Sequence, residues 1–284
     1  LAGGKGTRLH PITKAMNKHL LPIYDKPMIY YSISILLLAE IKDILLIINE
    51  EDYSQYKMIL GNGDFLGISI EYKIQDKPEG LPQAFVIAED FLKGNDAILI
   101  LGDNLFYGQG ISHIIKQSIL KNKGATFLGI KVNDPERFGV INVDKNGVPI
   151  DFEEKPKKPK SNLASVGIYI FTNDVIIRSK NLKKSKRGEY EMKDLFYSYK
   201  KSNNLSLEIL GRGITWLDTG TVSSLLEASN MIKLIQEKNR FIVACLEEIA
   251  LKKGWISKNK LKKQIKGMAD NVYKNYLTKL LNDY

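Results

Sequence analysis

The sequence contains little cysteine, little histidine and no long apolar run. Of its 284 residues one is a cysteine, Cys245, and three are histidines, His10, His19 and His113. A single cysteine excludes an internal disulfide and a cysteine-rich zinc site, and it fits a reducing compartment, so we expect a cytoplasmic protein. The histidines lack the spacing of a metal-binding set, and no Ser-His-Asp or Cys-His arrangement can be assembled around them.

Membrane segments and export signals are also missing from the pattern. The longest apolar stretch, residues 28–39, is interrupted by two tyrosines and two serines, whereas a bilayer-spanning helix needs about 18 to 20 apolar residues. No signal-peptide pattern is visible. The chain begins at Leu1, directly on a glycine-rich loop of a kind that normally follows a buried strand. We therefore expect several residues of a first strand to precede Leu1.

The sequence contains fewer acidic than basic residues: 32 aspartates and glutamates against 42 lysines and arginines, which gives a net charge of +10. Such an excess makes a nucleic acid or a smaller anionic ligand a candidate partner. The lysines are densest at 155–160, 183–187 and 258–266, without the interleaved aromatic residues of an RNA-binding surface. We therefore expect a solvated basic surface and no nucleic-acid partner, an alternative that salt-sensitive binding to duplex DNA would revive.

Strand and helix patterns alternate along most of the chain. Short apolar runs at 44–48 and 97–101 are typical of strands buried on both faces, and helical patterns lie between them. The alternation predicts an α/β fold with a Rossmann-like, mostly parallel mixed sheet flanked by helices. Beyond residue 239 only helical patterns occur. We expect an α/β domain over 1–238, with its first strand truncated, and a C-terminal helical extension over 239–284.

The most informative segment is the glycine-rich turn LAGGKGTR at residues 1–8. Glycines allow positive φ and a close approach of the ligand, so consecutive N–H groups can converge on a phosphate. Arg8 adds a planar, permanently charged group that suits phosphate oxygens. The spacing matches neither the dinucleotide-binding fingerprint nor the Walker A loop. Taken alone, the turn could be purely structural.

Two aspartates stand where ligands bind in open α/β sheets, beyond the carboxyl ends of strands. Asp103 follows the apolar run 97–101, and Asp218 lies before an expected helix that Thr221 could cap. Either could be a turn or capping residue, but two such carboxylates near a glycine loop suggest Mg²⁺ on a triphosphate. Lys18 and the EEKP segment at 153–156 offer cations for phosphates and an acceptor for hydroxyls.

Several motifs, in this order, resemble those of the sugar-1-phosphate nucleotidylyltransferases. LAGGKGTRL at 1–9 and KHLLPIYDKPMI at 18–29 are similar to the family signature. Within the family, the resemblance is to the glucose-1-phosphate thymidylyltransferase group, through LGDN at 101–104, DPERFGV at 134–140, EEKP at 153–156 and WLDTG at 216–220. It covers essentially the whole chain, including the helical tail.

The resemblance implies that a phosphate oxygen of glucose-1-phosphate attacks the α-phosphorus of dTTP in line, which gives dTDP-glucose for the dTDP-rhamnose pathway and releases pyrophosphate. By motif position, the expected catalytic residues are Arg8, Lys18, Asp103 and Asp218, and the two aspartates are the expected Mg²⁺ ligands. The expected nucleotide-binding residues are Gly3, Gly4, Gly6, Thr7, Arg8, Gln75, Gly80 and Asp103. The expected sugar-phosphate-binding residues are Gly139, Glu154, Lys155 and Arg187.

Three positions depart from the family pattern. Phe138 stands where tyrosine is usual, and the segment Ser165-Val166-Gly167 stands where valine-threonine-glycine is usual. Both lie in segments expected near the sugar, so they bear on which sugar is preferred. Pro82 replaces an alanine in the first turn of a helix, where proline is tolerated.

The resemblance also implies a homotetramer that dTDP-rhamnose inhibits at a subunit interface. Tyr107, Gly108, Arg212 and the tail are the candidates for that inhibitory site. Two alternatives to the main reading stay open. One is a uridylyl- or adenylyltransferase acting on a related sugar-1-phosphate, and the other is a non-catalytic, nucleotide-binding regulatory homologue. A non-catalytic homologue is expected to have lost charged residues of the site, yet the charged residues of the expected site are all present in this sequence.

Overall fold

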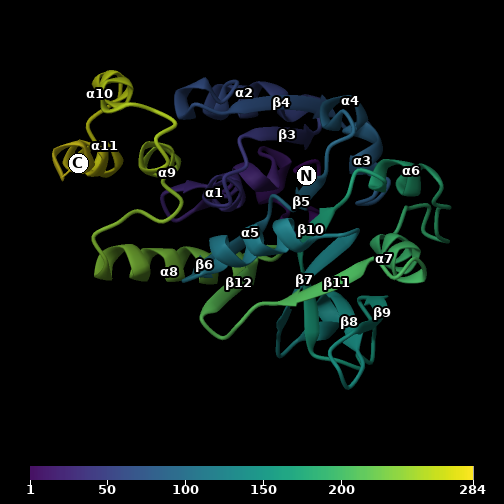
Figure 1. The fold of residues 1–284 in the computed structure, drawn as a ribbon. Helices are drawn as coiled ribbons and strands as arrows, with labels where there is room; N and C mark the ends of the chain where they lie inside the picture. The colour runs from purple at the N-terminus through teal and green to yellow at the C-terminus, as the bar shows by residue number, and fades with distance from the viewer. Residues whose placement is uncertain (284) are drawn as a thin grey trace.

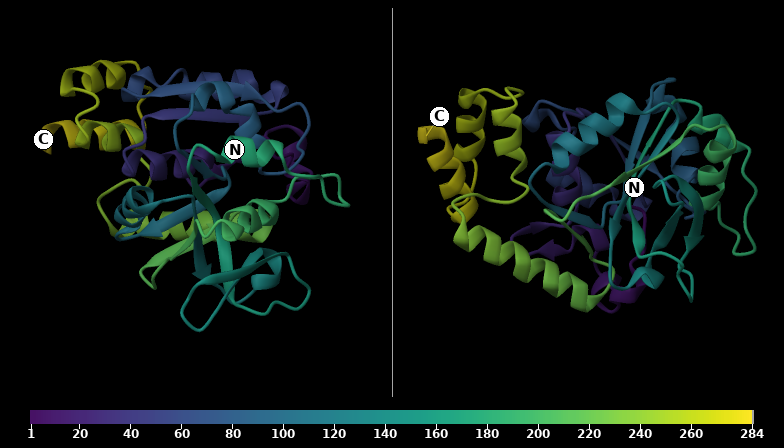
Figure 2. Two further views of the ribbon diagram at one scale, coloured as in Figure 1. Left: turned by 45° about the vertical axis from the view of Figure 1, so that its right-hand side comes forward. Right: turned by 60° about the horizontal axis from the view of Figure 1, so that its bottom comes forward.

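The computed structural model describes residues 1–283 as a layered α/β fold with a helical extension at its C-terminal end (Figures 1 and 2). The strands are β1 (Pro22–Ile23), β2 (Lys26–Pro27), β3 (Asp43–Ile48), β4 (Ser69–Ile74), β5 (Ala97–Ile100), β6 (Asn104–Gly108), β7 (Ala125–Lys131), β8 (Gly139–Val143), β9 (Pro149–Glu154), β10 (Leu163–Phe171), β11 (Leu205–Ile209) and β12 (Ile214–Asp218). The α-helices are α1 (Ile29–Leu38), α2 (Tyr53–Leu60), α3 (Gln83–Ile87), α4 (Glu89–Leu92), α5 (Ile111–Lys121), α6 (Val175–Lys180), α7 (Met192–Lys201), α8 (Val222–Lys238), α9 (Leu246–Lys252), α10 (Lys258–Lys266) and α11 (Val272–Asp283).

The main sheet has six strands, in the order β11-β7-β10-β8-β9 with β5 also paired to β10. β11 runs parallel to β7, and the other pairs of this sheet are antiparallel. Beside it lie the parallel pair β3–β4 and the antiparallel pair β6–β12. Helices cover the strands, as Figure 1 shows for α5 and α7. The predicted α/β class with a mixed sheet flanked by helices is confirmed, but in the main sheet the antiparallel pairs outnumber the parallel one, because β10 runs antiparallel to each of its neighbours.

The core of the main sheet is aromatic. All nine residues of β10 are buried, because the strand has paired neighbours on both edges and side chains packed on both faces. Phe127 on β7 makes edge-on contacts with Phe152, Tyr169, Phe171 and Phe196, at 4.9 to 6.0 Å between ring centroids. These contacts fasten β7, β9, β10 and α7 to one another.

The first residues connect the end of β3 with the end of β5. The Ala2 N–H donates to the Ile47 carbonyl at 2.8 Å. The Leu1 amino group donates to the Ile100 carbonyl at 2.9 Å, and the Leu1 carbonyl accepts from Gly102 at 3.0 Å. Leu1 also lines a largely apolar cavity of about 780 Å³ between β3, β5 and α1. The glycine-rich loop therefore starts where these two strands end.

The helices beyond α8 pack on the α/β part, where α9 contacts α1. Leu246, Leu261 and Leu277, from α9, α10 and α11, share one buried cluster with Ile33 and Leu37 of α1. The predicted helices of the extension are thus confirmed, and their core is continuous with the core beneath α1. Within residues 1–283, no helix combines the length and the apolar character that a membrane crossing requires.

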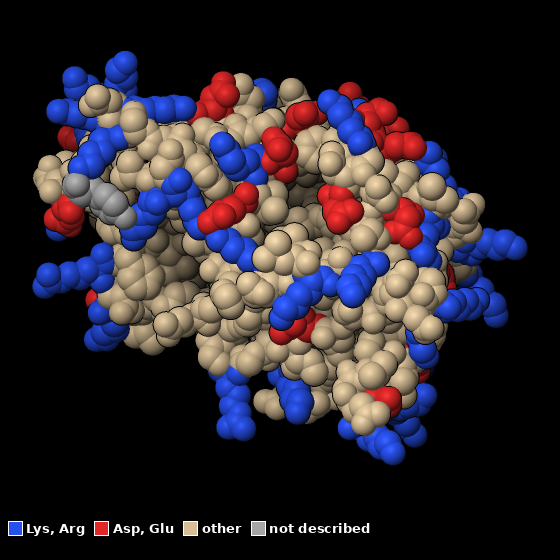
Figure 3. All heavy atoms as spheres, viewed as in Figure 1, with Lys and Arg blue, Asp and Glu red and all other residues tan. Residues whose placement is uncertain are grey.

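The basic side chains on the face drawn in Figure 3 are spread out and interleaved with acidic ones. Several are paired in exposed or half-exposed ion pairs, such as Lys116 and Lys253 with Glu40 at 2.6 Å. Ion pairs of this kind contribute little to stability. On this face, the excess of lysine therefore forms a solvated surface, as the composition predicts.

Replacing Phe127 with alanine is expected to lower the free energy of unfolding by about 3–5 kcal/mol, because the aromatic cluster loses its central ring and a cavity remains. Leu120→Ala is the control, since Leu120 on α5 is 78% exposed; there we expect a change within about 0.5 kcal/mol. Chemical denaturation followed by circular dichroism measures both variants. Equal, small losses would contradict a central role for Phe127.

Candidate active site

The glycine-rich loop lies directly against two of the predicted site residues. Gly6 has φ of 59°, and a β-carbon there would lie 2.8 Å from Cβ of Lys18. At Gly3, a β-carbon would lie 2.7 Å from Oε1 of Gln75. Any larger residue would displace these neighbours, so glycine is required for the close approach. Thr7 begins the short 3₁₀ turn η1 (Thr7–Leu9), which directs Arg8 out of the loop.

Lys18 and Asp103 form a short, largely buried ion pair. Lys18 Nζ lies 2.5 Å from Asp103 Oδ2, and the two side chains are 6% and 23% exposed. Asp103 lies just beyond β5, and Lys18 opens the 3₁₀ turn η3 (Lys18–Leu20). Burial alone would raise the pKa of Asp103, but the charge and the hydrogen bond of Lys18, together with smaller contributions from neighbouring groups, outweigh burial and hold that pKa below its ordinary value. Asp103 is therefore a carboxylate at neutral pH.

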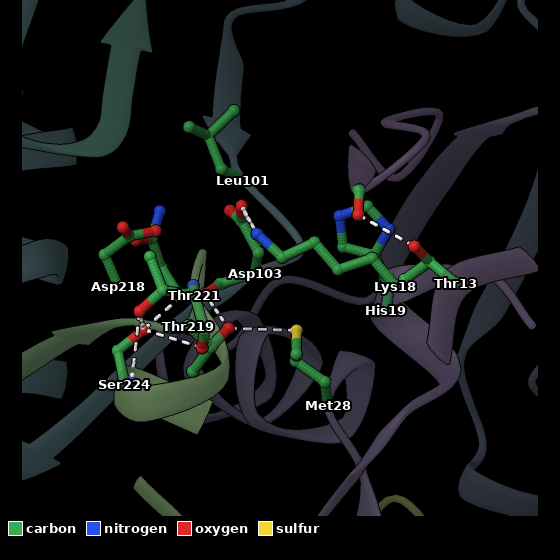
Figure 4. A network of polar contacts seen from close by, with 12 residues as sticks. Thr13, Lys18, His19, Met28, Leu101, Asp103, Asp218, Thr219, Thr221 and Ser224 are labelled. Carbon is green, nitrogen blue, oxygen red and sulfur yellow. Dashed lines mark hydrogen bonds and ion pairs between the residues drawn. The ribbon is translucent and has the colours of Figure 1, made fainter. Parts of the chain in front are cut away.

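Asp218 stands beside Asp103 because β12 pairs with β6 in a register that places Asp218 opposite Asn104. Figure 4 draws Lys18 reaching toward Asp103 from one side, with Asp218 on the other. Burial raises the pKa of Asp218, and the negative charge of Asp103 raises it further. The structure thus brings together the three predicted residues Lys18, Asp103 and Asp218.

A threonine-rich turn fixes the backbone between Asp218 and α8. The Thr219 hydroxyl donates to the Asp103 carbonyl at 2.8 Å, which ties the two carboxylate-bearing segments together. Thr221 and Ser224 form a capping box at the start of α8, so the predicted cap is confirmed. At Gly220, a β-carbon would lie 2.8 Å from Arg8 Nη2 and 2.9 Å from Asp218 Oδ2. Arg8 is thereby placed beside the second aspartate.

Two neighbouring carboxylates suit a divalent cation. The repulsion between Asp103 and Asp218 would be relieved by a positive ion between them. Oxygen ligands are what Mg²⁺ prefers, and it is commonly held by one or two carboxylates together with substrate phosphates. Across residues 1–283 no cluster of three or more histidine, cysteine, aspartate or glutamate side chains could hold a metal unaided. The pair therefore fits a magnesium ion that arrives with a phosphate ligand.

The predicted base-binding residues lie at the end of β4 and in the loop that follows. The Gln75 side chain is buried, and its Nε2 donates to Gln83 Oε1 at 2.7 Å. Gln83 Oε1 also accepts from the Glu79 N–H at 3.0 Å, so the orientation of the Gln75 amide is fixed. Gly80 has φ of 101°, and its α-carbon lies so close to the Tyr190 carbonyl that a side chain would collide with it.

Three of the predicted sugar-phosphate residues lie on or next to the β8–β9 edge of the main sheet, and the fourth, Arg187, comes from the loop between α6 and α7. Gly139 on β8 pairs with Glu154 at the end of β9. Burial raises the pKa of Glu154, and the positive charges of Lys155 and Arg187 oppose this rise. Both basic residues therefore lie near the Glu154 carboxyl group. Lys155 Nζ is 3.9 Å from a Glu154 oxygen. Arg187 pairs with Glu191 at 3.0 Å, a partner that sequence analysis did not indicate.

Arg137 is a site residue that sequence reasoning missed. Its Nη1 lies 2.5 Å from Asp134 Oδ2, and its Nη2 lies 3.6 Å from Asp218 Oδ2. Its guanidinium covers the Phe138 ring, which packs in turn on Trp216 with ring centroids 4.8 Å apart. An arginine in a polar turn usually indicates a solvated surface. The pairing of the turn with Asp218 is tertiary, so no local signal reveals it.

Comparison with known proteins agrees with this geometry. The chain matches the nucleotidyl transferase family over residues 1–234. It is 48% identical to a glucose-1-phosphate thymidylyltransferase of Neisseria meningitidis, over 99% of this chain and 98% of that protein. A Bacillus anthracis crystal structure named for the same enzyme and complexed with a sucrose has a TM-score of 0.74 and 40% identity, covering 81% of this chain and 92% of that one.

A UDP-glucose pyrophosphorylase complexed with UDP-glucose has a TM-score of 0.71 and 26% identity, and the match covers 84% of this chain and 97% of that chain. The fold is thus shared by enzymes named for different nucleotides. Sequence identity is higher for the relatives named as thymidylyltransferases, at 48% and 40% against 26%. The chain therefore belongs to the nucleotidyl transferase family, and within it to the glucose-1-phosphate thymidylyltransferases.

Proposed function

We propose that this protein transfers a thymidylyl group from dTTP to glucose-1-phosphate in a Mg²⁺-dependent reaction, giving dTDP-glucose and pyrophosphate. The observation that carries the proposal is the cluster of Lys18, Asp103 and Asp218 beside the glycine-rich loop. A triphosphate needs backbone donors, cations and a metal site within reach of one another, and these groups meet that need.

The chemistry is a displacement at phosphorus, so the protein mainly supplies position and charge. The N–H groups of Gly3, Gly4 and Gly6 cradle the triphosphate, and Arg8 orients the pyrophosphate that leaves. Lys18 neutralises negative charge on the phosphates during transfer. Asp103 and Asp218 would hold Mg²⁺, which when bound polarises the α-phosphate and templates both substrates.

The second substrate approaches from the β8–β9 side. Gly139 and Glu154 hydrogen-bond hydroxyls of the glucose, and Lys155 and Arg187 neutralise its phosphate. A phosphate oxygen of the sugar phosphate then forms a bond to the α-phosphorus as the bond to the pyrophosphate breaks. At the opposite end of the site, Gln75 and Gly80 bind the thymine edge.

The second candidate function is uridylyl or adenylyl transfer to a related sugar-1-phosphate, because a UDP-glucose pyrophosphorylase has the same fold. Gln75 bears against adenylyl transfer, since its amide is fixed by Gln83 and presents a defined edge to the base, whereas thymine and uracil would meet that edge alike. Phe138 bears on the sugar, because the ring covered by Arg137 and packed on Trp216 has no hydroxyl to offer.

We also propose that the protein is a cytoplasmic homotetramer that serves dTDP-rhamnose synthesis and is inhibited by dTDP-rhamnose. The proposal is supported by the family resemblance and by the adjacency of Gly108 on β6 and Ile214 on β12, which brings the turn of Arg212 close to Tyr107. Sedimentation analysis tests the assembly. Activity that stays unchanged as dTDP-rhamnose is added would contradict the feedback.

Pyrophosphate release tests the proposed function. The purified protein is supplied with Mg²⁺ and glucose-1-phosphate, and dTTP is compared with UTP, ATP, CTP and GTP. We expect release to be fastest with dTTP and to stop when glucose-1-phosphate is omitted. A preference for UTP or ATP would support the second candidate. No release with any nucleotide, from folded protein that binds dTTP, would support a regulatory homologue instead.

Asp218→Asn is expected to lower kcat by about 100-fold or more, because the cation that stabilises charge at the reacting phosphate is held less tightly. The same change should weaken binding of Mn²⁺, used as a probe for Mg²⁺ and measured by titration calorimetry with a non-hydrolysable dTTP analogue. Asp270→Asn is the control, since the Asp270 side chain in the tail is 93% exposed. If Asp218→Asn bound Mn²⁺ as tightly as the wild type, Asp218 would not be a metal ligand.

The KM for glucose-1-phosphate is expected to rise as the pH falls. Glu154 accepts its strongest hydrogen bonds from hydroxyls when it is ionised, and burial raises its pKa above the ordinary 4.5. The carboxylate is therefore present above that raised pKa and lost below it, so affinity for the sugar phosphate falls on acidification. Steady-state kinetics from about pH 5 to pH 8 measure the dependence. In Glu154→Gln, KM should be higher and nearly independent of pH; an unchanged profile would contradict the role.

A further inference from the structure

A buried polar network lies beneath the glycine-rich loop, built from residues to which the proposed mechanism assigns no part. Asn17 is its centre and is 7% exposed. Asn17 Oδ1 accepts from the His19 backbone N–H at 2.9 Å, from His19 Nδ1 at 2.8 Å and from the Tyr56 hydroxyl at 3.1 Å. Asn17 Nδ2 donates to Asp52 Oδ2 at 2.5 Å. Four contacts therefore fix this one amide.

Asp52 sets the direction of the network. Its side chain is buried, and its Oδ2 accepts from Asn17 and from Asn49, the latter at 2.9 Å. A buried carboxylate requires such donors, because burying it unpaired is costly. Since a carboxylate only accepts, each amide must turn its NH₂ group toward Asp52. The amide oxygen of Asn17 is thereby directed toward His19.

The His19 ring is wedged between two parts of the active site. A β-carbon at Gly4 would lie 3.7 Å from ring atom Cε1, and one at Gly102 would lie 2.8 Å from ring atom Cδ2. The ring therefore touches both the glycine-rich loop and the turn that leads into Asp103. Burial lowers the pKa of His19 to about 4, so the ring is neutral and its Nδ1–H donates to Asn17.

Lys18 lies between Asn17 and His19 in the chain, so the network holds its backbone from both sides. A free lysine side chain has much conformational freedom, and fixing it carries an entropic cost. We propose that Asn17, His19 and Asp52 are positioning residues that hold Lys18 against Asp103 and support the glycine-rich loop. The inference deepens the proposed function and rests on it.

The chemical reactivity of Lys18 tests this role without any substrate. Trace labelling with acetic anhydride, followed by peptide mass spectrometry, reports how freely each amine meets solvent. Lys26 is the internal control, because its side chain is 3% exposed and its Nζ lies 2.5 Å from Asp25. In Asn17→Ala and in Asp52→Asn we expect Lys18 labelling to rise about tenfold while Lys26 labelling stays constant.

A positioning role also predicts a particular kinetic pattern. In Asn17→Ala we expect kcat to fall about ten- to hundredfold, with KM for both substrates within about threefold of wild type, as expected when a transition-state interaction is lost. His19→Gln keeps a neutral N–H donor and should recover most of the kcat that His19→Ala loses. Asn122→Ala is the matched control, since the Asn122 amide contacts Thr126 and Gly124 outside the site.

Two results would overturn the inference. One is unchanged Lys18 labelling and unchanged kcat in a folded Asn17→Ala protein. The other is an equal rise of labelling at Lys18 and Lys26 in both variants, which would mean general loosening of the fold. Because labelling needs no turnover, a wild-type protein without transferase activity would refute the proposed function and leave this test of the network intact.

Discussion

The site depends on one interaction, the ion pair between Lys18 and Asp103 in a largely buried setting. Breaking such a pair by removing one partner typically costs about 3–5 kcal/mol, because the remaining charge stays buried and uncompensated. Because solvent has little access to the pair, hydrogen bonds from neighbouring residues have to hold the two charged side chains in place. Thr219 ties the Asp103 backbone to the turn after β12, and Asn17 holds the turn from which Lys18 extends. The charged pair is thus fixed from both sides before any phosphate arrives.

The fold places this pair at a meeting point of otherwise separate elements. The glycine-rich loop begins where β3 and β5 end. Gln75, which follows β4, lies against this loop at Gly3, on the side where we propose that the base binds. The β6–β12 pairing carries Asp218 next to Asp103. On the far side, the β8–β9 hairpin presents Gly139 and Glu154. In the function that we propose, a nucleotide and a sugar phosphate therefore approach from different elements and meet at the two carboxylates.

Sequence reasoning succeeded where a function leaves a local pattern. The glycine spacing, an aspartate directly after an apolar run, and a threonine before a helix predicted the loop, Asp103 and the α8 cap, and the structure confirms those positions. Contacts between distant segments left no such pattern. Arg137 reaches Asp218 across the fold, and Asn17 reaches Asp52, 35 positions further along the chain. Individually these residues have the properties of turn or surface residues, so their roles follow only from tertiary structure.

The most direct test of the account is the stereochemical course of the reaction at the α-phosphorus. One diastereomer of dTTP with sulfur on the α-phosphate is turned over with glucose-1-phosphate, and phosphorus NMR gives the configuration of the product. The account predicts inversion, because one in-line displacement occurs while Lys18 and the two aspartates supply only charge and position. Retention would mean two displacements through a covalent enzyme–nucleotide intermediate, and would contradict it.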